Sequence, residues 1–495
     1  MTRSVLDALD AHAAARPDAL ALDDVSYAAL RDASLRVAAR LRDAGLNPGD
    51  RLAIYAENRP GFVYAYLGGL RAGAIVVTVN VLYRTADLTN ILDDATPSVV
   101  CVSAQSAQFV PPDHPYAVID LADVEQWAKL PIPPLAHPPP VAAGDAAILI
   151  YTSGTTGRSK GATLTHGNLG AIADALVEAW HWTSADTLLL TLPLFHVHGL
   201  GAGLNGTLIA GGRVLLRERF DASAVVAMLA NGEATMFFGV PTMYVRMLEQ
   251  AGEGMRFDRV RLFVSGSAAL PATVHEEFAR RFGVSILERY GATEFGFALS
   301  NRYDAARHAG TVGFPLPHVE VRLADANGTD VAPGEAGEIL VHGPNVFKGY
   351  WRNDAATAAA FWTDDRGRRW YRSGDLATFD PERGYAINGR LKELVISGGF
   401  NVYPIEVETE LLRVPGIRAA AVVGQPDPAR GEIPVAFVEV DDAFDADAAL
   451  ATLRERLASF KVPKHLYRID ALPRNAMGKV EKPRLRELLR GHSTR

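Results

Sequence analysis

Short apolar segments alternate with segments of helical periodicity through the first 310 residues, and this alternation restricts the fold more than any other feature of the chain. Residues 26–45 and 60–71 carry apolar side chains at the spacing of amphipathic helices. The strands expected between such helices are residues 52–55, 75–79, 148–151, 188–192, 235–238 and 262–264. Short apolar strands separated by helices predict parallel sheets that are covered by helices.

The rest of the chain has two different patterns. Residues 310–390 are rich in glycine and contain short alternating runs such as 338–342, which predict a small β-rich section. Mixed helix and strand patterns follow at 407–412, 419–423, 435–440, 446–457 and 466–469. We therefore predict an α/β protein with two domains. Residues 1–390 form a large N-terminal domain of helix-flanked sheets with the β-rich section, and residues 391–495 form a small α+β C-terminal domain.

Composition excludes several classes of protein. A single cysteine, Cys101, allows neither an internal disulfide nor a cysteine-based metal site. A net charge of −7 disfavours a dedicated nucleic-acid binder. Asp7 and Asp10 interrupt the region where a signal peptide needs an apolar run, and Arg71 interrupts the most membrane-like stretch, residues 62–83. We expect a cytoplasmic protein without a membrane span, present as a monomer or a dimer.

Two weak motifs receive structural interpretations. Residues 201–206 match G-x-G-x-x-G, but a dinucleotide site needs this motif at the start of a βαβ unit, so we favour close helix packing. His196 and His198 have neither a cysteine nor a nearby carboxylate to complete a metal site.

The strongest motif is the run of glycines, hydroxyl side chains and one lysine at residues 151–161, directly after an apolar strand. Glycines let backbone amides turn toward an anion, and the hydroxyls and Lys160 add further donors, so the motif predicts a polyphosphate cradle. It is not a Walker A loop, because Ser159 and Gly161 flank the lysine. Arginine is the usual cation of this chain, which makes a lysine in this position more informative.

The segment resembles the phosphate loop of the adenylate-forming superfamily, which includes acyl-CoA synthetases, adenylation domains of peptide synthetases and firefly luciferase. The resemblance extends over nearly the whole chain, because the other motifs of the superfamily occur in the same order. The matching segments are residues 151–161, 290–294, 371–375, 389–393, 397–401 and 473–479.

The resemblance implies a reaction in two halves. A carboxylate attacks the α-phosphate of ATP, giving an acyl-adenylate and pyrophosphate, and the thiol of coenzyme A then displaces AMP. Negative charge accumulates on phosphate oxygens in the first half, so fixed donors, cations and Mg²⁺ would stabilise the transition state. The chemistry requires no protein nucleophile.

The resemblance also implies roles for individual residues. The ATP phosphates would be held by Thr152, Ser153, Gly154, Thr155, Thr156, Gly157 and Lys160. Thr293 would contact the α-phosphate and Glu294 would bind Mg²⁺. Tyr290 would stack on the adenine, while Asp375 and Arg390 would hold the ribose.

The C-terminal domain would be mobile and would supply the catalytic lysine. Lys479 would bridge the carboxylate and the α-phosphate in the first half-reaction only. Lys392 would be the hinge about which the domain rotates, and Gly398 and Gly399 would line the tunnel for the pantetheine arm of coenzyme A.

The acid substrate is indicated by one arginine. The segments expected to line an acyl pocket contain His198, Arg246, Ser267 and Arg289. Arg289 precedes the adenine residue Tyr290, so it must lie close to the site. An arginine buried there without a partner would be costly, whereas a second carboxylate on the substrate would pair with it. Local strings around these residues also resemble malonyl-CoA synthetases, which indicates malonate or methylmalonate.

Other interpretations remain open. Arg289 could pair with an internal acid such as Glu288, which would leave the pocket neutral. The enzyme would then be a medium- or long-chain fatty acyl-CoA synthetase. A third possibility is an adenylating module that loads a carrier protein, or a nucleotide-binding protein without ligase activity.

Overall fold

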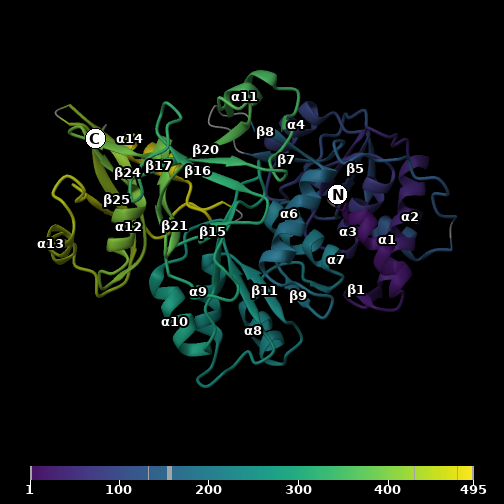
Figure 1. Ribbon diagram of the computed structural model, residues 1–495, viewed down its shortest axis with the longest axis horizontal. Coiled ribbons are helices and arrows are strands. Elements are labelled where there is room, and N and C mark those ends of the chain that lie inside the picture. The colour runs from purple at the N-terminus through teal and green to yellow at the C-terminus, as the bar shows by residue number, and fades with distance from the viewer. Residues whose placement is uncertain (1–2, 132, 153–158, 429, 476–477, 493–495) are drawn as a thin grey trace.

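The computed structural model describes residues 3–131, 133–152, 159–428, 430–475 and 478–492, and Figure 1 shows their arrangement. Two large sheets dominate the first part of the chain. In order across the first sheet, the strands are β18 (Gly349–Tyr350), β8 (Lys160–Thr165), β7 (Ala146–Thr152), β4 (Ile75–Val79), β3 (Arg51–Tyr55), β5 (Val99–Val102) and β6 (Ala117–Asp120). The strands from β7 to β6 run parallel, and β8 and β18 add an antiparallel edge.

The second sheet has the same parallel centre. Its order is β15 (Phe314–Pro315), β14 (Leu299–Ser300), β13 (Leu287–Tyr290), β12 (Leu262–Ser265), β11 (Met236–Gly239), β9 (Thr187–Leu190), β10 (Arg213–Leu216), β1 (Leu20–Leu22) and β2 (Val25–Ser26). The strands from β13 to β1 are parallel, which confirms the prediction from the alternating sequence.

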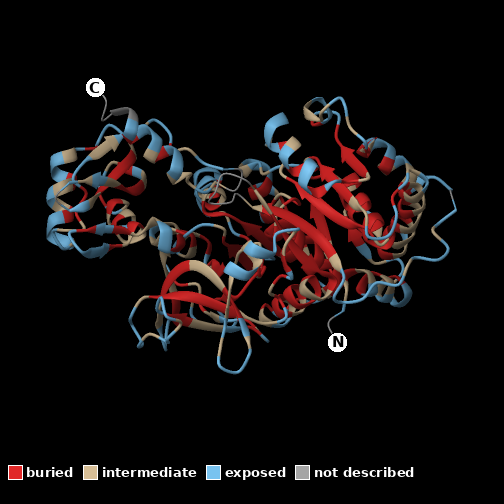
Figure 2. Ribbon diagram, turned by 90° about the horizontal axis from the view of Figure 1, so that it is seen from above, coloured by how far each residue is buried: buried red, intermediate tan, exposed pale blue. Residues whose placement is uncertain are grey.

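The two sheets share one apolar core, because alternate residues of each strand point to opposite faces. Leu52 and Val76 of the first sheet join the same buried cluster as Leu188 and Phe238 of the second. The helices packed in this shared layer are α1 (Val5–Ala15), α2 (Tyr27–Asp43), α3 (Pro60–Arg71), α5 (Leu121–Lys129) and α6 (His166–Ala179). Figure 2 shows the buried strands and helices at the centre of this part.

The outer face of each sheet has its own helices. Helix α4 (Thr85–Ala95) covers Val77 and its neighbours in the first sheet. Phe237 and Phe263 of the second sheet pack against α8 (Ala222–Ala230), α9 (Pro241–Gln250) and α10 (Ala272–Phe282). The result is a layered helix–sheet–helix–sheet–helix arrangement.

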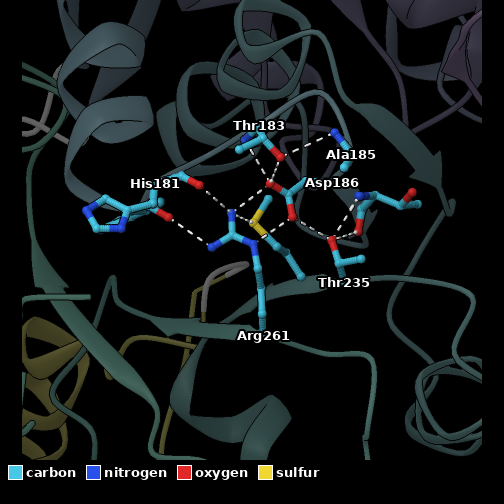
Figure 3. A network of polar contacts seen from close by, with 9 residues as sticks. His181, Thr183, Ala185, Asp186, Thr235 and Arg261 are labelled. Atoms are coloured by element: carbon cyan, nitrogen blue, oxygen red, sulfur yellow. Dashed lines mark hydrogen bonds and ion pairs between the residues drawn. The ribbon is translucent and has the colours of Figure 1, made fainter. Parts of the chain in front are cut away.

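An ion pair with a buried carboxylate lies at the amino ends of three neighbouring parallel strands (Figure 3). Arg261, next to β12, bonds both carboxylate oxygens of Asp186, next to β9, at 2.6 and 2.7 Å. Thr235, next to β11, donates to the same carboxylate at 2.9 Å. Burial alone would raise the pKa of Asp186, but the bonds from Arg261 and the Thr183 N–H outweigh it and lower that pKa. The opposite, carboxyl ends of the strands remain available for a ligand site, as is usual in α/β sheets.

The G-x-G-x-x-G match lies inside helices, as we predicted. It spans the π-helix η2 (His198–Asn205) and the start of α7 (Gly206–Ala210), both buried. A Cβ at Gly203 would lie 2.7 Å from Leu190, and one at Gly206 would lie 2.8 Å from Trp182. These glycines therefore permit close packing, which confirms the structural interpretation.

The later segments form two smaller sheets. The first of these is built from β16 (Glu320–Ala324), β17 (Gly337–His342), β20 (Arg369–Asp380), β19 (Phe361–Thr363) and β21 (Gly384–Arg390). It is the β-rich section that the glycine-rich pattern predicts. The short 3₁₀ turn η3 (Leu391–Glu393) then leads into the last part of the chain.

The C-terminal part is an α+β unit with its own core. Its strands are β23 (Phe400–Val402), β22 (Val395–Ser397), β25 (Gly431–Val440), β24 (Ile417–Asp427) and β26 (Leu466–Arg468). Its helices are α12 (Pro404–Leu411), α13 (Ala446–Arg456) and α14 (Lys482–His492). The unit stands at one end of the molecule in Figure 1. A large part of helix-flanked sheets followed by a small α+β unit is the predicted fold class, which is therefore confirmed. Among the described residues, no helix combines the length and apolar character needed to cross a membrane.

Candidate active site

The predicted ribose residues meet on adjacent strands. Asp375 lies opposite Arg390 in the β20–β21 pair, and the two side chains form an ion pair with 2.8 Å between the arginine Nε and Oδ1 of the carboxylate. The other carboxylate oxygen accepts a hydrogen bond from the Tyr290 hydroxyl at 2.6 Å. The sequence indicates only an adenine contact for Tyr290, whereas the structure also gives its hydroxyl a fixed partner. Asp375 lies within β20 and directly follows Gly374, whose φ is 68°.

Glu294 follows β13 in the loop that leads from Tyr290. Its side chain is buried, and one carboxylate oxygen accepts a hydrogen bond from the Tyr350 hydroxyl at 2.9 Å. Burial raises the pKa of Glu294, and the bond from Tyr350 opposes that rise. A buried carboxylate with a single side-chain donor is suited to receive a cation.

The surroundings of Glu294 fit Mg²⁺ better than a metal held entirely by protein. Within the described part of the chain, no group of three or more histidine, cysteine, aspartate or glutamate side chains could bind a metal ion. Magnesium is commonly held by one or two carboxylates together with substrate phosphates and water. Glu294 would supply the protein ligand, and the nucleotide would supply the others.

The predicted phosphate loop is described only at its two ends. Ser153, Gly154, Thr155, Thr156 and Gly157 lie outside the described residues. Thr152 and Lys160 are paired across strands β7 and β8. The Lys160 ammonium lies 5.3 Å from the centre of the Tyr350 ring, within the range of a cation–π contact.

Lys479 comes from the C-terminal part of the chain but lies near the ribose residues. It is an exposed residue, and partial loss of water around its ammonium and the positive charge of Arg390 lower its pKa, while Asp375 and Glu393 oppose this. A Cβ at the preceding Gly478 would lie 3.1 Å from Thr242 in α9. The lysine loop therefore touches the large domain and brings Lys479 toward Asp375.

The predicted hinge and tunnel residues lie apart from this site. Lys392 is exposed in η3. Gly398 and Gly399 form the exposed turn between β22 and β23, and a Cβ at either position would meet no atom within 4 Å. The structure does not bring this turn to the nucleotide residues, so its role in binding coenzyme A stays a prediction.

Three of the predicted acyl residues come together as the Arg289 cluster, which consists of Arg289, His198, Ser267 and Phe297. Arg289 on β13 is buried, and its guanidinium carbon lies 4.4 Å from the centre of the Phe297 ring. The Ser267 hydroxyl lies 3.5 Å from Nδ1 of His198. Phe297 has no distinguishing sequence signal.

Three polar atoms of the Arg289 cluster lack hydrogen-bond partners among the described residues. Nε and Nη2 of Arg289 and Nε2 of His198 are buried without a hydrogen-bond partner in the described structure. Burial lowers the pKa of Arg289 to about 9. Burial, with help from Arg289, also lowers the pKa of His198, which keeps the imidazole neutral. The cluster offers several donors that nothing in the described protein accepts.

Glu288 does not neutralise Arg289. Successive residues of β13 point to opposite faces, and Glu288 accepts a hydrogen bond from the Gly310 N–H at 3.3 Å. Burial raises the pKa of Glu288 to about 8, so its side chain carries little charge at neutral pH. The alternative in which Glu288 pairs with Arg289 is therefore wrong.

Arg246 does not join the Arg289 cluster. It is exposed on α9, whereas Tyr244 and Met247 of the same helix are buried. The helical periodicity that buries those two residues turns Arg246 outward, so we correct its assignment to the acyl pocket.

Comparisons with known proteins agree with this geometry. Residues 9–351 match the AMP-binding enzyme family, and residues 406–479 match the AMP-binding enzyme C-terminal domain. The chain belongs to the AMP-binding enzyme family. The first match covers Tyr290 and Glu294, and the second reaches Lys479.

Relatives of this AMP-binding enzyme include several acyl-CoA ligases. A feruloyl-CoA synthase of Amycolatopsis sp is 38% identical, with 93% of each chain covered. The mitochondrial malonate–CoA ligase of Mus musculus is 34% identical, with 93% of this chain and 86% of the relative covered. The ATP-bound crystal structure of MatB from Rhodopseudomonas palustris superimposes with a TM-score of 0.90 at 37% identity, with 99% of each chain covered. The AMP-binding enzyme described here is an AMP-forming acyl-CoA ligase that uses ATP.

Proposed function

We propose that the protein is a malonate–CoA ligase. The observation that carries this proposal is the buried Arg289 guanidinium, whose Nε and Nη2 have no hydrogen-bond partner among the described residues. An unpaired buried cation is unfavourable, and a carboxylate at the far end of a short diacid would pair with it through two parallel hydrogen bonds. A neutral His198 adds a donor at Nε2 when Nδ1 accepts from Ser267.

Gly266 supports the same interpretation. A Cβ at this position would lie 2.4 Å from the guanidinium carbon of Arg289, so only glycine leaves room for the side chain as it stands. A backbone that makes space for a buried arginine favours recognition of an acid by that arginine. Relatives named as malonate–CoA ligases agree with this choice, whereas the feruloyl-CoA synthase keeps a larger aromatic acid as a second candidate.

We propose that the two half-reactions use the residues as follows. The phosphate loop with Lys160 holds the triphosphate, and Thr293 contacts the α-phosphate. Glu294 would hold Mg²⁺, which would supply positive charge to neutralise the phosphates. Lys479 orients the attacking carboxylate against the α-phosphate. The domain of residues 391–495 then turns about Lys392, and Gly398 and Gly399 admit coenzyme A.

The test is AMP formation with malonate, methylmalonate, octanoate and ferulate compared side by side in the presence of ATP, Mg²⁺ and coenzyme A. Malonate should have the highest kcat/KM. Arg289→Leu should reduce kcat/KM for malonate by at least about a hundredfold, because one partner of a buried ion pair is lost. Arg246→Leu, which removes an exposed arginine, is the matched control and should leave it unchanged.

A preference for ferulate or octanoate would contradict the malonate proposal and would make Arg289 a structural residue. Activity toward malonate that survives in Arg289→Leu would contradict it as well. AMP formation from any of these acids would still agree with an acyl-CoA ligase.

A further inference from the structure

One aromatic side chain joins two parts of the nucleotide site that lie far apart in sequence. Tyr350 donates a hydrogen bond from its hydroxyl to Glu294 at 2.9 Å. The Lys160 ammonium lies over the same ring, 5.3 Å from the ring centre.

The backbone holds Tyr350 in this position. Strand β18 consists of Gly349 and Tyr350 only. Tyr350 pairs with Ala162 of β8, the strand that directly follows the phosphate loop. The Trp351 N–H also donates to Gly161 at 2.7 Å. The ring is therefore fixed relative to the end of the loop that carries Lys160.

The other end of the segment is fixed to the Glu294 loop. The Phe347 N–H donates to the Glu294 carbonyl at 2.7 Å. The Asn345 amide donates to the carbonyls of Phe295 and Phe297 at 2.8 and 2.9 Å. Residues 345–351 thus connect the carboxylate loop to the phosphate loop through the backbone as well as through Tyr350.

Aromatic packing also holds the Tyr350 ring. The Phe347 ring packs edge-on against Tyr350, with 5.0 Å between the ring centres, and edge-on against Tyr371 of β20, with 5.5 Å between the ring centres. Strand β20 also carries the ribose residue Asp375, so this packing connects Tyr350 to the ribose strand.

We propose that Tyr350 is a positioning residue that fixes the Glu294 carboxylate and the Lys160 ammonium relative to each other, so that metal and triphosphate bind as one unit. Its hydroxyl sets the rotamer of Glu294, and its ring supports the lysine. This inference rests on the proposed magnesium role of Glu294.

The hydroxyl and the ring can be separated by two substitutions. Tyr350→Phe removes the bond to Glu294 but keeps the ring under Lys160, whereas Tyr350→Leu removes both. The measurement is the calorimetric affinity for ATP in EDTA and in Mg²⁺, with no acid or coenzyme A present. The ratio of the two affinities gives the contribution of the metal without any turnover.

Tyr350→Phe should keep the metal-free affinity for ATP but lose about tenfold of the gain that Mg²⁺ provides, as substitutions of groups that orient metal ligands do. Tyr350→Leu should lose the same metal-dependent gain, and its metal-free affinity should also fall by about threefold. Tyr385→Phe is the control, because its hydroxyl lies 3.4 Å from a carbonyl in the β-rich section and meets neither Glu294 nor Lys160.

Glu294→Gln distinguishes failure of this inference from failure of the magnesium assignment. If Glu294→Gln loses the metal-dependent gain while Tyr350→Phe keeps it, the positioning role of Tyr350 is overturned alone. If Glu294→Gln also keeps the gain, the magnesium role of Glu294 is wrong and the inference fails with it. A metal-free affinity that falls equally in Tyr350→Phe and Tyr350→Leu would mean that the tyrosine only supports the fold.

Discussion

Adjacent residues of β13 have opposite electrostatic roles because a strand turns successive side chains to opposite faces. Arg289 lies among donors that have no described partner, while Glu288 is buried on the other face and accepts the Gly310 N–H. Sequence proximity to Tyr290 is enough to predict that Arg289 lies near the site. It cannot reveal whether the guanidinium is paired, since that depends on side chains brought from elsewhere by the fold.

The raised pKa of Glu288 predicts a pH-dependent stability. Its pKa rises from the usual 4.5 to about 8 in the fold, so the folded state keeps a proton that the unfolded chain releases. The resulting stabilisation is complete below pH 4.5 and is lost as the pH rises toward 8, at about 1.4 kcal/mol per pH unit. Glu288→Gln removes this titration, so the variant should gain stability relative to the wild type as the pH increases.

The measurement is the thermal midpoint of the wild type and of Glu288→Gln at several pH values across that window. Glu276→Gln, an exposed change on α10, is the control and should follow the wild type at every pH. A constant difference between Glu288→Gln and the wild type would show that Glu288 does not titrate in the folded protein.

Elements with strong periodicity are predicted well from the sequence, and short connecting elements are not. Helix α3 and strand β4 match the predicted ranges, because a run of apolar residues at one period determines both type and position. Strand β18 has two residues, too few for any period, and its pairing with β8 depends on contacts across nearly two hundred positions. For that reason Tyr350 could not be assigned to the site from sequence.

The residues of the site could likewise be predicted only in part from the sequence. Motifs indicate Asp375, Arg390 and Glu294, and the structure brings Asp375 and Arg390 into contact. A motif identifies a residue type at a spacing but not the direction of its side chain, which is why Arg246 was assigned to the wrong environment. The exposed face of α9 becomes apparent only when its buried residues Tyr244 and Met247 are known.

The lysine loop provides a prediction at the scale of an element. Gly478 has a positive φ of 72°, and a Cβ there would lie 3.1 Å from Thr242. Gly478→Ala should therefore displace Lys479 and slow acyl-adenylate formation, by about tenfold for a cost of roughly 1–2 kcal/mol. Transfer from preformed acyl-adenylate to coenzyme A should be unaffected, because Lys479 is proposed to act only in the first half-reaction.

Each half-reaction can be measured separately, by pyrophosphate exchange and by thioester formation from added acyl-adenylate. Gly431→Ala is a matched control: its φ is 77°, and a Cβ there would meet no atom closer than 3.7 Å. It imposes similar backbone strain in the C-terminal part without a contact to α9. If both alanine variants slow pyrophosphate exchange equally, the contact with Thr242 has no role in placing Lys479.

At the scale of the whole molecule, the structure presents one arrangement of its two parts. Lys479 is close enough to Arg390 and Asp375 for their charges to alter its pKa, while the Gly398–Gly399 turn is exposed on the surface. With Lys479 in its proposed role, this arrangement suits formation of the acyl-adenylate. Since the turn is proposed to admit coenzyme A, the second half-reaction requires the C-terminal part to turn, and Lys392 is the position proposed to allow it.

The proposed hinge residue, Lys392, precedes a segment that is held by ion pairs. Lys482 at the start of α14 pairs with Glu408 at 2.7 Å and with Glu393 at 3.4 Å. Glu393 is therefore fixed to the C-terminal part, whereas Arg390 is fixed to Asp375 in the large domain. Only residues 391 and 392 lie between these two attachments, which supports the proposal that Lys392 is the hinge.

Lys392→Pro should therefore separate the two half-reactions. Proline fixes φ and restricts the preceding residue, which limits the backbone change that a hinge must make. The hydrogen bonds that close η3 are donated by the Leu394 N–H, so the substitution does not remove them. Pyrophosphate exchange should remain within about threefold of the wild type, while thioester formation should fall by about a hundredfold, as expected when a hinge sets the rate of a conformational step. Lys392→Ala is the control, because it removes the exposed side chain but keeps the backbone free, and it should change neither rate. An equal loss of both rates in Lys392→Pro would place the hinge elsewhere, and so would unimpaired thioester formation in that variant.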